Sequence, residues 1–399
     1  MKKKFLALVT ASALALRLAA CGGSSSSAAS SAPAASGATS GAAGSSSGTF
    51  KLGVIGPLTG ENAIYGQAVA NGAQIAVDEI NAEGGAIQFE LKSEDDVADG
   101  ETSVNAYNNL LDWGMQVLVG PTTTGASIAV AAEAYNDRVF MLTPSASSTD
   151  VVSGKDNVFQ VCFTDPNQGV GAADYMAENM AGSKIAVIYR NDDPYSQGIH
   201  DTFVSEAAEK GQEIVYEGTF TADTATDFSV QLTGAQSAGA DTVFLPLYYQ
   251  PASVILNQAN AMGYEPTFFG VDGMDGILTM EGFDPALAEG VMLLTPFSAD
   301  ATDELTQNFV SAYQAAYGDI PNQCAADAYD AVYAVKAALE ATGCTSDMDA
   351  VAICEAMVAA MPTIAVDGLT GQGMTWSSTG EVSKAPMAVV IKDGAYTLP

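Results

Sequence analysis

Apolar residues fall into short blocks along the chain, and the first blocks after residue 50 predict a strand followed by a helix. The run Leu52 to Ile55 stops at Gly56, which suits a strand that is buried on both faces. Between Val69 and Ile80, apolar residues recur at spacings of four, three and four, which places them on one helical stripe. The glycines at 84–85 then end the helix and let the chain turn back.

The rest of the chain repeats this strand, loop and helix unit, which predicts an α/β fold with parallel sheets. Further strands are expected at 87–91, 117–119, 139–142, 184–189, 214–220, 241–247, 267–271 and 290–295. Helices are expected near 227–238, from 250 to 262, and near 303–317, 324–341 and 348–360, with a last strand and turn at 387–396. A second set of units begins around 158–165. The segment from Thr49 to Pro399 is longer than a chain that folds around a single hydrophobic core usually is, so we expect two lobes.

The amino terminus reads as a targeting segment. Lysines at 2–4 precede an apolar run from Phe5 to Leu16, which is too short for a stable membrane span and fits a secretory signal. The run leads into Leu-Ala-Ala-Cys at 18–21, the lipobox pattern of bacterial lipoproteins, in which Cys21 carries the lipid. Arg17 departs from that pattern. We therefore expect a lipoprotein signal peptide at 1–21.

Residues 22–48 are Ser, Ala, Gly and Thr with one proline and no charge. Such a segment cannot bury enough apolar surface to fold, so we expect a flexible tether. The formal net charge of the chain is -33, which argues against nucleic acid as a partner and against direct docking on anionic lipid.

Cysteine and histidine usage disfavours metal binding. The chain has one histidine, His200, and no Cys-x-x-Cys or Cys/His spacing, so a zinc site is not expected. Cys344 and Cys354 flank a turn and could form a disulfide, whereas Cys162 and Cys324 lie in apolar or alanine-rich surroundings typical of buried thiols. No serine-hydrolase, metalloprotease or related catalytic motif is present, so we expect neither a cofactor nor an enzyme.

Two strand exits in the first half are rich in hydroxyl groups. The octet at 120–127 has the spacing of a phosphate-binding loop, but Ala126 stands where the lysine belongs, which disfavours nucleotide binding. Free main-chain N–H groups at a helix start, with threonine hydroxyls beside them, still suit a carboxylate. A second hydroxyl-rich exit follows at 143–148.

The second half has three exits of its own, at 191–198, 248–249 and 272–276, and the first half has a third exit at 57–62. In open parallel sheets, the ligand crevice lies beyond the carboxyl ends of the strands. We therefore expect all six loops to converge on one cleft between the lobes.

Several segments resemble the branched-chain amino acid binding proteins, which are the extracellular solute receptors of ABC importers. The matching segments are IGPLTG at 55–60, a Tyr-Gly pair at 65–66, AVDEINAEGG at 76–85, TPSAS at 143–147 and AYDAVYAV at 328–335. The resemblance implies the type I periplasmic-binding-protein fold, with two doubly wound parallel-sheet lobes joined by a three-strand hinge. It places residues 49–164 plus about 296–380 in the first lobe, and 165–295 plus about 381–399 in the second.

The resemblance also implies the ligand-binding residues. The expected donors for a ligand carboxylate are Thr123, Thr124, Ser145 and Ser147, and the expected pocket aromatics are Tyr65, Tyr195, Tyr248 and Tyr249. Asp272 occupies the position of the acidic residue that holds the ammonium group, where the family more often has glutamate.

The expected function is therefore that of a monomeric, extracytoplasmic receptor, lipid-anchored to the bacterial cell membrane. It would bind a branched-chain or other aliphatic amino acid and deliver it to the transmembrane permease subunits of an ABC importer. The alternative is a sensor or receptor of the same fold for amides, urea or another small solute. An anchored hydrolase is a third and less favoured interpretation.

Overall fold

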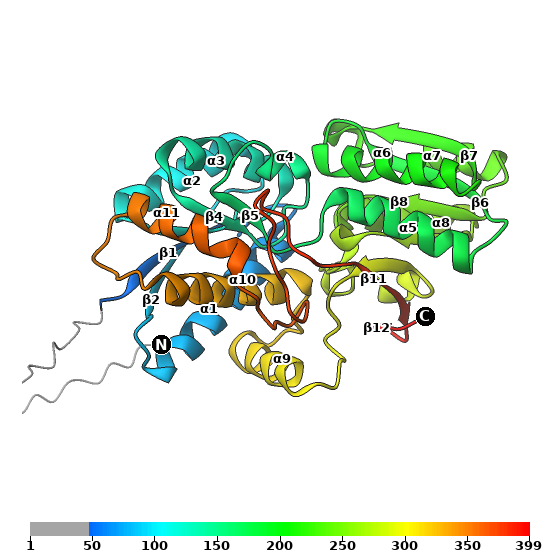
Figure 1. Cartoon of the computed structure of the whole chain (residues 1–399). Coiled ribbons are helices and arrows are strands. Elements are labelled where there is room, and N and C mark those ends of the chain that lie inside the picture. Colours follow the sequence, from blue (N-terminus) through cyan, green and yellow to red (C-terminus); the bar gives the residue numbers. More distant parts are fainter. Residues whose placement is uncertain (1–47) are drawn as a thin grey trace, which may run out of the picture. The chain divides into compact units, whose positions relative to one another are not determined.

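The structure, a computed structural model, describes residues 48–399 (Figure 1). The expected signal peptide with Cys21, and the expected tether as far as residue 47, lie outside the described residues. Residues 48–399 belong to one compact unit. None of the helices in this part of the chain has the length and apolarity needed to cross a membrane.

The first lobe is built on a five-stranded parallel sheet in the order β2-β1-β3-β4-β5. Its strands are β1 (Phe50–Gly56), β2 (Phe89–Asp95), β3 (Val117–Val119), β4 (Phe140–Thr143) and β5 (Val158–Gln160). Its helices are α1 (Ala63–Glu83), α2 (Gly100–Trp113), α3 (Thr124–Asp137), α4 (Thr149–Val152), α9 (Glu304–Tyr317), α10 (Gln323–Thr342) and α11 (Ala350–Ala360). Helix α1 packs along α10, and α2 packs against α3 (Figure 1). The apolar runs of β1, β3 and β4 are buried because helices cover them.

The second lobe is built on a seven-stranded sheet in the order β12-β11-β10-β9-β8-β6-β7. Its strands are β6 (Lys184–Arg190), β7 (Glu213–Phe220), β8 (Thr242–Leu245), β9 (Thr267–Gly270), β10 (Met292–Thr295), β11 (Met387–Lys392) and β12 (Ala395–Thr397). Its helices are α5 (Asp165–Asn179), α6 (Pro194–Glu209), α7 (Ser229–Ser237) and α8 (Tyr249–Met262). Short 3₁₀ turns are η1 (Ala222–Thr224), η2 (Asp272–Met274), η3 (Ile277–Thr279), η4 (Pro285–Ala288) and η5 (Met361–Thr363). Its parallel strands repeat the order of the first sheet, so each lobe has a crevice at its strand exits.

An antiparallel hairpin at the edge of the second sheet was not part of the prediction of parallel sheets. Strand β11 pairs antiparallel with β10, and β12 pairs antiparallel with β11. The connecting residues Asp393 and Gly394 both have positive φ, at 52° and 75°. That conformation is typical of the two-residue turns whose twist matches a hairpin.

The chain passes between the lobes three times. It leaves the first sheet after β5, returns after β10 to form α9, α10 and α11, and crosses again to reach β11. The last crossing is fastened by Lys384, whose Nζ lies 2.7 Å from an Asp327 carboxylate oxygen on α10, and both side chains are only 2% exposed. The four cysteines in the described residues are all free and buried, so the possible bridge between Cys344 and Cys354 is not formed.

Candidate functional site

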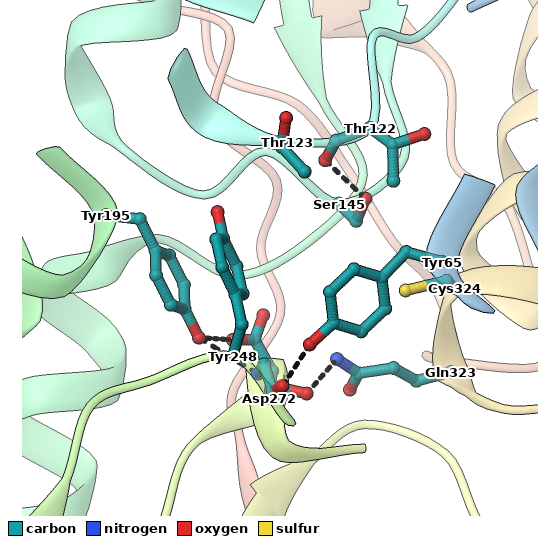
Figure 2. Close-up of a pocket in the computed structure, with 10 residues that line it drawn as sticks. Tyr65, Thr122, Thr123, Ser145, Tyr195, Tyr248, Asp272, Gln323 and Cys324 are labelled. Atoms are coloured by element: carbon teal, nitrogen blue, oxygen red, sulfur yellow. Dashed lines mark hydrogen bonds between the residues drawn. The ribbon is translucent and has the colours of Figure 1, made fainter. Parts of the chain in front are cut away.

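A cavity lies between the lobes at the carboxyl ends of the strands (Figure 2). It is lined by Tyr65, Thr122, Thr123, Ser145, Tyr195, Tyr248, Asp272, Gly273, Gln323 and Cys324. Each of the six predicted strand exits, taken with the start of the helix that follows it, contributes at least one of these residues. The convergence of the loops on one cleft is therefore confirmed. It follows from parallel topology, which brings strand ends from distant parts of the sequence to one edge.

The first-lobe side of the cavity is formed by the start of α3. Thr123 is the N-cap residue of this helix, but its side chain makes no capping hydrogen bond. The hydroxyl oxygens of Thr123 and Thr124 are buried and have no hydrogen-bond partner. Ser145 Oγ donates to the main-chain oxygen of Thr122 over 2.8 Å. The start of a helix exposes unpaired N–H groups, so this wall offers donors to an anion.

Two of the expected carboxylate donors, Thr124 and Ser147, do not line the cavity. Both are fully buried behind its wall. Ser147 Oγ accepts from Gln168 Nε2 over 3.5 Å, while Gln168 Oε1 accepts from the main-chain N–H of Asp272 over 3.1 Å. Ser147 is thus connected to the second lobe through Gln168.

Asp272 forms the opposite wall, and its side chain is 4% exposed (Figure 2). Tyr195 donates its hydroxyl to Asp272 Oδ1 over 2.5 Å, and Gln323 Nε2 donates to the main-chain oxygen of Asp272 over 3.0 Å. Burial raises the pKa of Asp272 to about 7, although the hydrogen bonds from Tyr195 and Gln168 oppose the rise. A buried carboxyl group of this kind is strongly favoured as a carboxylate once a cation lies beside it.

Three tyrosine rings separate these two walls. Tyr195 and Tyr248 stack with ring centroids 4.6 Å apart, and the edge of Tyr65 meets Tyr248 at 5.6 Å. Tyr65 donates its hydroxyl to the main-chain oxygen of Gly273 and accepts from the N–H of Tyr249 over 3.0 Å. Tyr249 lies behind Tyr65 and does not line the cavity, although it was expected to do so.

The sequence prediction did not include Gln323 and Cys324, which reach the cavity from the first turn of α10. Asn322 caps this helix through its side chain, accepting from the N–H of Ala325. The capping residue is a sequence signal for the helix start. The capping residue alone could not show that the start of α10 faces the cleft, because the position of α10 depends on how the chain returns to the first lobe after β10.

Other chemistry-bearing groups lie away from the cavity. His200 contacts Asp201 and Glu217 through its two ring nitrogens, each over 2.8 Å, and is not a lining residue. Within residues 48–399, no group of three or more histidine, cysteine or acidic side chains is arranged to hold a metal ion.

Comparisons with known proteins agree with this geometry. Residues 49–395 match a family described as periplasmic binding protein. The chain is 32% identical to the Leu/Ile/Val-binding protein homolog 3 of Brucella melitensis, over 83% of this chain and 88% of the relative. It is 28% identical to the leucine-, isoleucine-, valine-, threonine-, and alanine-binding protein of Pseudomonas aeruginosa, over 74% of this chain and 79% of the relative.

Among solved structures, the chain resembles the branched-chain amino acid transporter substrate binding protein LivJ of Streptococcus pneumoniae, determined in complex with isoleucine. The TM-score is 0.78 and the identity 29%, with 88% of this chain and 98% of the other covered.

Proposed function

Because this chain belongs to the periplasmic binding protein family, we propose that it is the substrate-binding receptor of an ABC importer and that its cavity binds a free amino acid. The observation that carries the proposal is the chemistry of the two walls. The unpaired hydroxyl group of Thr123, at the start of α3, lies on one side, and the buried carboxyl group of Asp272 lies on the other. A ligand that satisfies both walls carries an anionic and a cationic group.

The charges of the lining residues support a zwitterion over a simple acid. Among the described residues that line the cavity, Asp272 is the one acidic residue, and none is a lysine, arginine or histidine. A carboxylate alone would be placed near an acidic group with no cation to offset it. With an ammonium group against Asp272, the charge of the ligand and the charge of the wall are both compensated.

The names of these relatives cover a range of amino acids, from leucine, isoleucine and valine to threonine and alanine. Within this range we propose a ligand with an aliphatic side chain. The alternative is a receptor or sensor for amides or urea, and a binding experiment must distinguish it from an amino acid receptor.

Titration calorimetry with matched analogues tests the proposal. We expect L-alanine or L-valine to bind, while propionate, which lacks the ammonium group, and L-alaninamide, which lacks the carboxylate, bind at least roughly thirtyfold more weakly. Leaving one buried charge unpaired costs about 2 to 5 kcal/mol, and the lower value gives that factor. Binding of urea or a simple amide, with no binding of any free amino acid, would overturn the proposal.

The ligand would also control the arrangement of the lobes. We assign residues 49–164 and about 296–380 to one moving body, and 165–295 and about 381–399 to the other. The support is the sheet membership of the strands and the three crossings between the sheets. A ligand held by Thr123 and Asp272 contacts both bodies and so favours the closed arrangement.

The location follows from the amino terminus. We propose that Cys21 carries a lipid and that residues 22–48 tether a monomeric receptor outside the cell membrane, beside the permease subunits. The lysines, the apolar run and Leu-Ala-Ala-Cys support this assignment. Fractionation of a Cys21→Ala variant checks it, because the processed protein should leave the membrane fraction. A variant that stays bound at full length would show that the apolar run is the anchor.

A further inference from the structure

The lobes are held together across the cavity by hydrogen bonds of two tyrosines. Tyr65 of the first lobe donates to the Gly273 carbonyl oxygen and accepts from the Tyr249 N–H, both in the second lobe. Tyr249 in turn donates its hydroxyl to the main-chain oxygen of Glu61 over 2.6 Å. These contacts join the start of α1 to the start of α8. The space left in the cavity is therefore that of closed lobes.

The hydroxyl groups of Tyr65 and Tyr195 are each held by two hydrogen bonds, which cross between the lobes for Tyr65 and stay within the second lobe for Tyr195. Tyr65 cannot retract without breaking the bonds between the lobes. The hydroxyl of Tyr195 donates to Asp272 Oδ1 and accepts from the main-chain N–H of Gly273 over 2.9 Å. Tyr248 lies between these rings, stacked on Tyr195 and edge-on to Tyr65. Its hydroxyl lies beside the main chain of Thr124, at the start of α3. Figure 2 shows the Tyr248 ring extending from the Asp272 wall toward Thr123.

The closed cavity is small. Its volume is about 20 Å³, and roughly 10–15 Å³ of such space is needed to hold one water molecule. The Tyr248 ring lies between Tyr195 and Tyr65, so it limits the room for a ligand that contacts both Thr123 and Asp272. The ring has to move further for every carbon added to the ligand's side chain. Closely packed interiors resist such additions because neighbouring side chains are forced out of their preferred rotamers.

We propose that the site selects amino acids with the smallest side chains, such as alanine and glycine, and that Tyr248 sets this limit. The inference rests on the proposed function, since it concerns which amino acid the cavity accepts. Tyr65 and Tyr195 hold the outer boundaries of the cavity, and the Tyr248 ring between them limits the space for a ligand side chain. Selectivity by size is then a property of one ring.

Calorimetric titration with glycine, L-alanine, L-valine and L-leucine tests the proposal on the wild type and two variants. We expect the wild type to bind alanine at least about tenfold more tightly than leucine, because one methylene in a confined pocket already discriminates by about that factor. Tyr248→Ala should reduce or reverse the ratio of the two affinities. Tyr248→Phe keeps the ring and should keep the ratio, whatever happens to the absolute affinity. Tyr135→Ala, at an exposed tyrosine outside the cavity, serves as the control and should match the wild type.

The outcomes separate this inference from the proposed function. A wild type that binds leucine as tightly as alanine, or more tightly, overturns the size limit and leaves the amino acid receptor intact. A tenfold preference that survives unchanged in Tyr248→Ala overturns the role of Tyr248. If Tyr248→Ala does not fold, the proposal is judged by the order of the four affinities in the wild type and by the ratio of the alanine and leucine affinities in Tyr248→Phe. Failure of all four amino acids to bind overturns the proposed function itself.

Discussion

At the scale of single residues, the account depends on one buried carboxyl group. Asp272 and Asp275 form a matched pair, since both are almost fully buried and burial raises the pKa of each, to about 7 and about 6. Asp272 lines the cavity, whereas Asp275 Oδ2 accepts from the main-chain N–H of Gln323 over 2.7 Å and lies outside it. The two carboxyl groups therefore have comparable burial but different access to a ligand.

We predict that Asp272→Asn weakens amino acid binding by at least roughly thirtyfold, since it removes the partner of a desolvated ammonium group. Asp275→Asn should reduce affinity much less. Titration calorimetry on both variants measures the two effects. Equal affinity of Asp272→Asn and the wild type would remove Asp272 from the site, and a large loss confined to Asp275→Asn would move the ammonium partner to that position.

Only some of the residues expected from the sequence at the site line the cavity in the structure. Tyr65, Tyr195 and Asp272 were identified and do line the cavity. Thr124 and Ser147 are buried and do not line the cavity, because side-chain direction depends on torsion angles that composition does not determine. Gln323 was missed because its helix returns to the cleft from a distant part of the chain.

At the scale of elements, the packing of α1 on α10 positions two cavity residues of the first lobe, Tyr65 and Gln323. Gly72 of α1 lies so close to α10 that a Cβ atom there would meet the Ala325 carbonyl oxygen at 2.0 Å. Tyr65 lies two turns earlier on α1, and Gln323 lies one turn or less from Ala325 on α10. The glycine thus lets the two helices approach where they carry residues to the site.

Gly72→Ala should lower the free energy of unfolding by about 1 to 3 kcal/mol, the usual cost of overpacking a core. Gly85→Ala is the control, because nothing lies within 4 Å of an added Cβ at that position. Chemical denaturation of the two variants gives the comparison. An unchanged denaturation midpoint in Gly72→Ala would show that α1 and α10 can move apart without lowering the free energy of unfolding.

Strands β2 and β5 differ from the sequence pattern, each for its own physical reason. Strand β2 extends to Asp95 because it pairs with β1 along its whole length. As an edge strand it tolerates the polar residues that follow the apolar run at 87–91, where the strand was expected. Strand β5 has three residues, as β3 does, but its third residue is the polar Gln160, so the apolar run is shorter than that of β3. The helices expected near 227–238, 250–262, 303–317, 324–341 and 348–360 agree with the structure to within a few residues.

At the scale of the whole molecule, the central claim is that one small zwitterion bridges two lobes. The two sheets could be predicted from the repeated units, but the return of α9, α10 and α11 to the first lobe was implied only by family resemblance. That return creates the three crossings and brings Gln323 to the cavity. A ligand that contacts both lobes stabilises the closed arrangement by its differential affinity for it.

Small-angle X-ray scattering with and without a saturating amino acid tests this claim most directly. The amino acid is the tightest binder of the calorimetric series, and saturation is calculated from its measured affinity. The account predicts a smaller radius of gyration in the bound protein, with a scattering profile that matches the closed lobes described above. An identical profile at full saturation would contradict the claim that the ligand draws the two lobes together.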